Sequence, residues 1–152
     1  SKLLYGQRGE VPEGEHLVPL GEAVVRRVGE HVTLVAYSRM VAEALRAAEV
    51  LAEHDVSAEV VDLRCLAPLD MATVAASVEK TGRVVVIEEG NLTGGVAAEI
   101  VARVVEECFD YLQAAPRRVA ALDVPVPASR VLEQAATPDW HDIARAAAEV
   151  LG

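Results

Sequence analysis

The stretch RVVVIEEGNLTGGVAAE, residues 83–99, decides the fold. It begins with a strand predicted over residues 83–87, whose aliphatic side chains are typical of a strand buried on both faces. Glu88 and Glu89 end this run, and Gly94 and Gly95 lie at the head of an amphipathic helix predicted over about residues 93–108. A strand, a loop and a helix in this order predict an α/β protein, in which ligands and partners meet the carboxyl ends of the strands.

The same alternation of strand and helix extends over the rest of the chain. Further strands are predicted over residues 32–37, 57–63 and 118–122, with Ser38 and Asp70 as N-caps of the helices that follow the first two. An earlier strand at residues 23–25 is joined to residue 32 by a turn too short for a crossover, so it must run antiparallel to a neighbour. The pattern therefore predicts a three-layer α/β/α fold around a mixed, mostly parallel sheet of about five strands, one of them antiparallel.

Two segments fall outside this alternation. Residues 1–16 are polar and contain Gly and Pro, which predicts a linker-like N-terminal segment before one domain at residues 17–152. Residues 123–139 are predicted to form a long loop, stiffened by Pro125 and Pro127. The pair Thr137-Pro138 predicts the start of the last helix.

Composition and charge narrow the function. The chain has 152 residues and is 52% hydrophobic but only 3% aromatic, so the core is expected to be aliphatic. A formal net charge of −10 argues against nucleic acid and anionic membrane surfaces; it favours a basic partner or serves solubility alone. Without a long apolar run or a signal-peptide pattern, we expect a soluble, cytoplasmic protein. The two cysteines lie far apart and predict reduced structural thiols.

Catalytic motifs are absent from the sequence. It has no glycine-rich phosphate loop, no nucleophile elbow and no metal-like spacing of histidines, so no catalytic, cofactor-binding or metal residue is predicted. Glu88 and Glu89 are adjacent on a strand and face opposite ways, which excludes a facing pair of carboxylates. One of them can point to a partner subunit or to the N-terminus of the next helix.

Three other groups of residues are candidates for contacts. Asp62 and Arg64 share one face at a strand end, which predicts an ion pair that orients the loop or contacts another subunit. Gly94-Gly95 either cradles an anion, which the nearby carboxylates disfavour, or allows another backbone to approach closely. Carboxylates gather near the end of the predicted helix, where the helix dipole disfavours them, so they indicate a basic partner or a solvated acidic face: Glu106, Glu107 and Asp110.

A series of motifs with consistent spacing covers nearly the whole chain. They are KLLYGQRGEVP at 2–12, VTLVAYSRMV at 32–41, VVDLRCLAPLD at 60–70, SVEKTGRVVVIEEG at 77–90, LTGGVAAEI at 92–100 and RRVAALDVPVP at 117–127. In this series the chain resembles the C-terminal domain of the β subunit of thiamine-dependent 2-oxo acid dehydrogenases, which is related to the C-terminal domain of transketolase.

The resemblance implies a role in assembly. In that family an α2β2 enzyme decarboxylates a branched-chain 2-oxo acid or pyruvate and transfers the acyl group to lipoyl. The cofactor, thiamine diphosphate with magnesium, is held by the α subunit and the first β domain, so none is expected on this chain. The implied partners are the α subunit, a second β subunit and the basic subunit-binding domain of the acyltransferase. The substrate stays open, and a transketolase-like enzyme or a stand-alone interaction module remains an alternative.

From the residues and the resemblance together, we predict a set of subunit or partner contacts. It comprises Asp62, Arg64, Glu88, Glu89, Thr93, Gly94, Gly95, Glu106, Glu107, Asp110, Leu151 and Gly152. The resemblance suggests that Glu88, Glu89 and the loop at 93–95 face the neighbouring catalytic domain. The acidic residues at 106–110 and the C-terminal end are the candidates for docking the acyltransferase.

Overall fold

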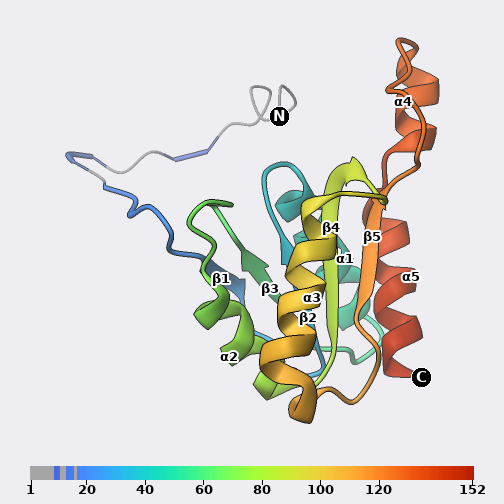
Figure 1. The fold of residues 1–152 in the computed structure, drawn as a ribbon. Helices are drawn as coiled ribbons and strands as arrows, with labels where there is room; N and C mark the ends of the chain where they lie inside the picture. The colour runs from blue at the N-terminus through green and yellow to red at the C-terminus, as the bar shows by residue number, and fades with distance from the viewer. Residues whose placement is uncertain (1–8, 11–12, 16) are drawn as a thin grey trace.

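A computed structural model describes residues 9–10, 13–15 and 17–152, and the rest of the predicted linker, 1–16, lies outside the described residues. Strands and helices alternate along the chain, as Figure 1 shows. In order they are β1 (Val24–Arg27), β2 (Val32–Ala36), α1 (Met40–Ala52), β3 (Ala58–Asp62), α2 (Met71–Thr81), β4 (Val84–Asn91), α3 (Val96–Cys108), the 3-10 turn η2 (Phe109–Tyr111), β5 (Arg117–Ala121), α4 (Arg130–Ala136) and α5 (Trp140–Leu151).

The five strands form one mixed sheet in the order β1-β3-β2-β4-β5. β1 runs antiparallel to β3, and the other neighbouring strands are parallel. This confirms the predicted fold, including the single antiparallel strand. β1 pairs with β3 rather than with the nearby β2 because β2 is already flanked by β3 and β4, which leaves β1 the open edge beyond β3.

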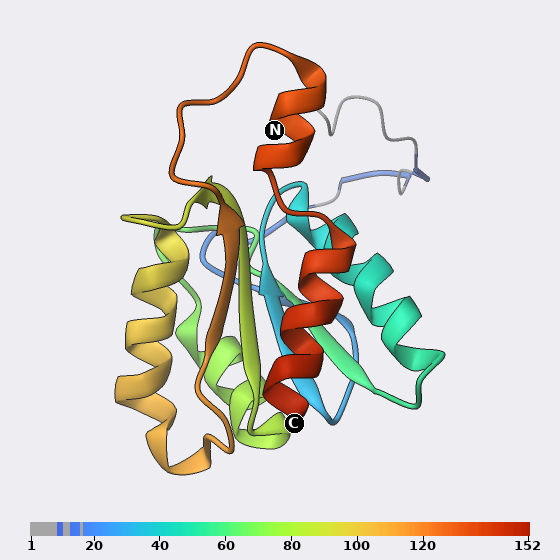
Figure 2. The ribbon, with the colours of Figure 1, turned by 90° about the vertical axis from the view of Figure 1, so that its right-hand side faces the viewer.

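Helices cover both faces of the sheet and give three layers. α1 and α5 lie on one face and α2 and α3 on the other, as Figures 1 and 2 show together. Every residue of β2 is buried; Leu34 and Ala36 pack among the side chains of α1 and α5, and Val35 packs on the opposite side. This alternation follows from the two-residue repeat of a strand and confirms the aliphatic core.

The structure confirms one predicted N-cap and corrects another. The Asp70 carboxylate accepts a hydrogen bond from the backbone N–H of Thr73 at 3.0 Å, as predicted for the start of α2. The prediction for Ser38 was wrong. α1 begins at Met40 with Arg39 at its N-cap position and without a side-chain cap, and Ser38 has a left-handed backbone with φ +57°. The chain turns sharply at Ser38, so the helix begins later than the serine predicts. A pattern of capping residues in the sequence does not reveal such a turn.

The segment predicted as a loop over residues 123–139 contains the helix α4, which that prediction missed. The Leu122 N–H donates a hydrogen bond to the Ala136 carbonyl at 3.0 Å, so the two ends of this excursion lie together. We call residues 122–136 the arm. None of the residues of α4 is buried, and Figure 2 shows α4 standing beyond the end of the sheet.

The last helix, α5, starts at Trp140, later than the predicted Thr137-Pro138. Asp139 is its N-cap. The His141 N–H donates to the Asp139 carboxylate at 2.8 Å. The Asp139 carboxylate also accepts from the Asp142 N–H, and the Asp139 N–H donates to the Asp142 carboxylate at 3.3 Å. The two bonds between Asp139 and Asp142 form a capping box, which stabilises this start over the earlier one.

Candidate functional site

The carboxyl ends of the parallel strands bring several predicted residues to one end of the sheet. Tyr37 follows β2, Asp62 ends β3, and Glu88 and Glu89 lie within β4. β4 is longer than predicted, because it continues to Asn91, and α3 begins at Val96 rather than at residue 93. The two acidic residues are therefore strand residues with opposite orientations.

Glu88 is the buried member of the pair, with a relative exposure of 1%. Its Oε2 accepts a hydrogen bond from the Tyr37 hydroxyl at 3.0 Å, and its Oε1 accepts one from the Ala97 N–H at 3.2 Å. A negative charge is stabilised at this place because the first N–H groups of a helix have no partners within it. Of the two directions predicted for this pair, a partner subunit or the N-terminus of the next helix, Glu88 takes the second.

The same carboxylate changes the chemistry of Tyr37. Burial of Tyr37 is the largest cause, and the negative charge and hydrogen bond of Glu88 add to it; together they raise the pKa of the phenol to about 12. The phenol therefore stays protonated and keeps donating to Glu88. The pair joins the end of β2 to the start of α3 and does not present a reactive phenolate.

Gly95 is the N-cap of α3 and makes room for the Glu88 carboxylate. A Cβ atom at Gly95 would collide with Glu88 Oε1 and would lie 2.6 Å from the Asn91 carbonyl oxygen. Gly94 differs, since it has a left-handed backbone with φ +75° and open space around its Cβ position. The group that approaches Gly95 closely is therefore the Glu88 carboxylate of the same chain. The space next to Gly94 is open and available to a partner.

Glu89 lies on the other side of β4 and belongs to a chain of charges. Arg39 lies 3.7 Å from Glu89 and 3.8 Å from Glu43, measured between guanidinium nitrogens and carboxylate oxygens. Glu43 also accepts a hydrogen bond from the Trp140 N–H at 3.2 Å, at the start of α5. These contacts connect β4, α1 and α5 at the carboxyl end of the sheet.

Asp62 is paired differently from the prediction. Its carboxylate accepts from Arg26 on β1, with the closest nitrogen at 2.9 Å, and the ion pair expected with Arg64 was wrong. Arg64 contributes its backbone N–H to Asp62 at 3.1 Å and has a left-handed φ of +56°. In an extended strand the side chains of Asp62 and Arg64 would lie on the same face. The left-handed backbone at Arg64 ends the extended conformation, so the two side chains point in different directions.

Thr93 is held by a residue that the sequence did not single out. Its N–H and its hydroxyl donate to the two carboxylate oxygens of Asp123 at 2.9 and 2.6 Å. The hydroxyl bond, followed by the N–H bond, holds the pKa of Asp123 below its usual range. This contact ties the loop before α3 to the start of the arm.

The opposite end of the sheet carries the predicted acidic group, and all three carboxylates are exposed: Glu106, Glu107 and Asp110. Glu107 pairs with Arg103 at 3.0 Å. Two aromatic side chains lie among these residues on η2, Phe109 with 69% of its surface exposed and Tyr111 with 50%. Exposed aromatic rings next to carboxylates resemble the centre and rim of a protein interface.

The predicted contact residues at the C-terminal end lie at the end of the last helix. Leu151 ends α5 and is half-buried, and Gly152 is exposed.

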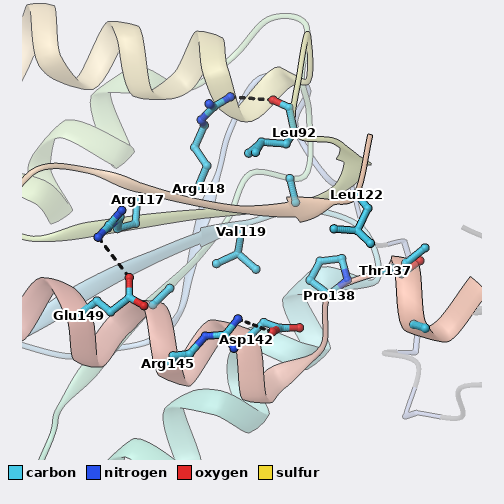
Figure 3. Close-up of a pocket in the computed structure, with 14 residues that line it drawn as sticks. Leu92, Arg117, Arg118, Val119, Leu122, Thr137, Pro138, Asp142, Arg145 and Glu149 are labelled. Atoms are coloured by element: carbon cyan, nitrogen blue, oxygen red, sulfur yellow. Dashed lines mark hydrogen bonds and ion pairs between the residues drawn. The ribbon is translucent and has the colours of Figure 1, made fainter. Parts of the chain in front are cut away.

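A groove lies along the outer edge of the sheet. It has a volume of about 320 Å³ and lies between β5 and α5, as Figure 3 shows. Its three arginines have partners within the chain: Arg117 with Glu149, Arg118 with the Leu92 carbonyl and Arg145 with Asp142. This cavity is therefore a structural groove between a strand and a helix, with its charges already paired.

Two features are absent from the part of the chain that the structure describes. There, no three or more His, Cys, Asp or Glu side chains come together in a way that could hold a metal ion. The helices in those residues are too short or too polar to cross a membrane. Cys65 and Cys108 are free thiols.

Comparison with known proteins places these features in a family. The family model "Transketolase, C-terminal domain" matches residues 21–143. Subunit beta-1 of the mitochondrial pyruvate dehydrogenase E1 component of Arabidopsis thaliana is 49% identical over 150 residues, which cover 96% of this chain and 41% of that protein. The beta subunit of acetoin:2,6-dichlorophenolindophenol oxidoreductase of Cupriavidus necator is 45% identical over 150 residues, covering 99% and 44%. This chain thus spans less than half the length of these curated relatives.

A solved structure shares the fold. A split gene transketolase, described as an inactive beta4 tetramer, superposes with a TM-score of 0.76 at 30% identity, over 86% of this chain and 42% of that chain.

Proposed function

Because this chain belongs to the transketolase C-terminal domain family, we propose that it is the assembly and partner-docking domain of the β subunit of a thiamine-dependent 2-oxo acid dehydrogenase. The observation that carries the proposal is the 49% identity to a pyruvate dehydrogenase β subunit over 96% of this chain. The names of the pyruvate dehydrogenase relatives favour pyruvate over a branched-chain 2-oxo acid as the substrate of the complete enzyme. The cytoplasmic location stays a prediction.

The cofactor of such an enzyme is assigned to other parts of the assembly. The described residues offer no cluster that could hold magnesium, and Glu88, the one fully buried carboxylate at the strand ends, is used by Tyr37 and α3. On this proposal, other parts of the complete enzyme hold thiamine diphosphate and its metal. Calorimetry tests this, because saturable micromolar binding of thiamine diphosphate to the isolated chain would contradict it.

The carboxyl end of the sheet suits the contact with the neighbouring catalytic domain. Thr93 and Gly94 are accessible there, and Thr93 is fixed by its two bonds to Asp123. Glu89 precedes this loop by four residues in the sequence and is paired with Arg39. A rigid, pre-ordered loop gains affinity because little conformational freedom is lost on binding.

The opposite end suits a basic partner such as the subunit-binding domain of the acyltransferase. The exposed carboxylates of Glu106, Glu107 and Asp110 are adjacent in sequence to the exposed rings of Phe109 and Tyr111. Aromatic side chains supply most of the binding energy in such surfaces, and the surrounding charges set the partner and the rate of encounter. The net charge of −10 acts in the same direction.

A second candidate function is the C-terminal domain of a transketolase-like enzyme. The specific observation in its favour is the split gene transketolase with a TM-score of 0.76. Its identity of 30% is lower than the 49% of the dehydrogenase subunit, which is why we place the dehydrogenase first. A stand-alone interaction module is the third.

Immunodepletion of the native protein separates these candidates. An antibody raised to this chain is used to deplete a lysate of the source organism, with pre-immune serum as control. Three activities are then measured: pyruvate decarboxylation, branched-chain 2-oxo acid decarboxylation and transketolase activity. We expect the pyruvate activity to fall together with the antigen while the other two stay.

Each other outcome selects a rival. Loss of the transketolase activity alone would assign the chain to that enzyme, and loss of the branched-chain activity would change the substrate. If all three activities survive complete depletion, the chain is not part of these enzymes and an interaction module becomes the leading function.

A further inference from the structure

A cavity separate from the groove at β5 lies where two neighbouring parallel strands, β2 and β3, end. The connection after β2 passes over one face of the sheet through α1, and the connection after β3 passes over the other face through α2. Adjacent strands whose connections leave on opposite faces open a crevice at their carboxyl ends, where open α/β sheets bind ligands. The cavity has a volume of about 540 Å³, which is within the usual range of small-molecule sites.

One buried carboxylate positions both arginines that line this cavity. Asp62, with a relative exposure of 8%, accepts hydrogen bonds from Nε and Nη2 of Arg26 at 3.0 and 2.9 Å. Its other oxygen accepts from the backbone N–H of Arg64 at 3.1 Å. Arg26 thereby uses two of the five N–H groups of a guanidinium. Among the described residues no carboxylate pairs with the Arg64 guanidinium, so both side chains keep donors for a ligand.

The backbone beside the cavity is held in a conformation that L-residues rarely adopt. Ser38 after β2 and Arg64 after β3 have φ of +57° and +56°, and both line the cavity. In the described part of the chain, the one other non-glycine residue with a positive φ is Asp55, in the turn after α1. This conformation lowers stability, and it is concentrated at ligand-binding places, where the surrounding structure maintains it.

The chemistry of the lining selects a small organic anion. Two arginines and one aspartate give the lining a net charge of +1, in a chain whose net charge is −10. Guanidinium groups bind carboxylates through paired hydrogen bonds. Apart from Ser38, the other lining residues are aliphatic: Val18, Val41, Ala42 and Leu45. Inorganic phosphate, with a charge of about −1.5 to −2 at pH 7 and no apolar part, matches neither the charge nor the aliphatic side chains.

We propose that this cavity binds a small monocarboxylate with a short aliphatic tail. The carboxylate lies on the guanidinium groups of Arg64 and Arg26, and the tail lies on the aliphatic side chains of α1. The proposal does not depend on the proposed function, because it uses only residues of this chain.

Nuclear magnetic resonance of the whole chain, titrated with isovalerate, tests the site. We expect saturable shifts of the backbone amides of Ser38, Leu45 and Arg64, with a dissociation constant on the order of 1 mM. Isovaleramide has the same shape without the charge and should bind at least about tenfold more weakly. Inorganic phosphate is the second comparison. If isovaleramide or phosphate binds as tightly as isovalerate, the proposed ligand class is wrong.

A pair of variants tests the role of Arg64. Arg64→Gln removes the charge of an exposed side chain and keeps the backbone bond to Asp62, so we expect it to fold and to bind isovalerate at least about tenfold more weakly. Arg130→Gln is the matched control, an exposed arginine on α4 outside this cavity, and should bind like the wild type. Equal melting temperatures confirm that both variants fold.

Two further results would overturn the proposal. One is the absence of saturable shifts up to about 50 mM isovalerate, far above the expected dissociation constant. The other is an Arg64→Gln variant that binds like Arg130→Gln. Immunodepletion measures a different property, so the proposed function can stand when this site fails.

Discussion

The N-cap glycine of α3 offers a sharp test of the buried carboxylate. Gly95 has φ −73° and ψ 162°, a conformation open to any residue, so Gly95→Ala introduces steric contacts without requiring a left-handed backbone. The new Cβ meets Glu88 Oε1, and the carboxylate must leave the Ala97 N–H or the Tyr37 hydroxyl. A hydrogen bond to a charged group contributes about 1.5–3 kcal/mol, so we expect a loss of about 2–4 kcal/mol in the free energy of unfolding.

Gly94→Ala is the matched control, one residue away. Gly94 has φ +75° and open space, so the alanine adds only the cost of a left-handed conformation, about 1–2 kcal/mol. Urea unfolding followed by circular dichroism measures both variants. The reasoning is refuted if Gly95→Ala costs no more than Gly94→Ala.

A double-mutant cycle separates the two contacts at Gly95. When Glu88→Ala is already present, the carboxylate is gone and the cost of Gly95→Ala should shrink, which gives a coupling free energy on the order of 1 kcal/mol or more. The cost should not vanish, because the Asn91 carbonyl oxygen remains 2.6 Å from the new Cβ. Additive costs would show that Glu88 and Gly95 do not interact.

Three further predictions concern other contacts. Tyr37→Phe removes the hydroxyl that donates to Glu88 and should cost about 1–3 kcal/mol in urea unfolding. Because folding raises the pKa of Tyr37 from 10 to about 12, its contribution is complete below pH 10 and lost as the pH rises towards 12; the phenylalanine variant should lack this loss. Lys80→Met leaves the buried Glu59 carboxylate without its ion-pair partner and should cost about 1–3 kcal/mol, with Lys80→Arg as the conservative control. Burial raises the pKa of Glu59, but the hydrogen bonds from Lys80 and Ser77 outweigh it and leave the pKa below its usual range, so the wild type loses this stability as the pH falls through that lowered value. Docking of a basic subunit-binding domain should weaken as salt rises, measured by calorimetry; an affinity independent of salt would contradict an acidic docking surface.

The fold could be predicted because its main signals are local. β2 and the first half of β4 are short aliphatic runs typical of buried strands, and their spacing leaves room for crossover helices. α4 could not be found this way, since Val131 and Leu132 face outward and its polar residues face the domain. The apolar residues of such a helix do not pack into the core of the domain, so their spacing does not produce the usual pattern of a surface helix.

The site was predicted only where neighbours in sequence are neighbours in space. Glu88 at the start of α3 follows from the strand-loop-helix unit, which brings residues nine apart together. The partner of Asp62 did not follow, because Arg26 lies on β1, and which strand β1 joins depends on the whole sheet. Asp123 was missed for the same reason, since its contact with Thr93 spans thirty residues.

The hydrogen bond between the Leu122 N–H and the Ala136 carbonyl has a consequence for how such proteins can diversify. It places the two ends of the arm side by side, so the segment between them can be exchanged or shortened without moving β5 or α5. An interaction surface held on such a closed insert evolves separately from the core. Transplanting the arm between related domains is then a way to change one exposed surface while the sheet stays as it is.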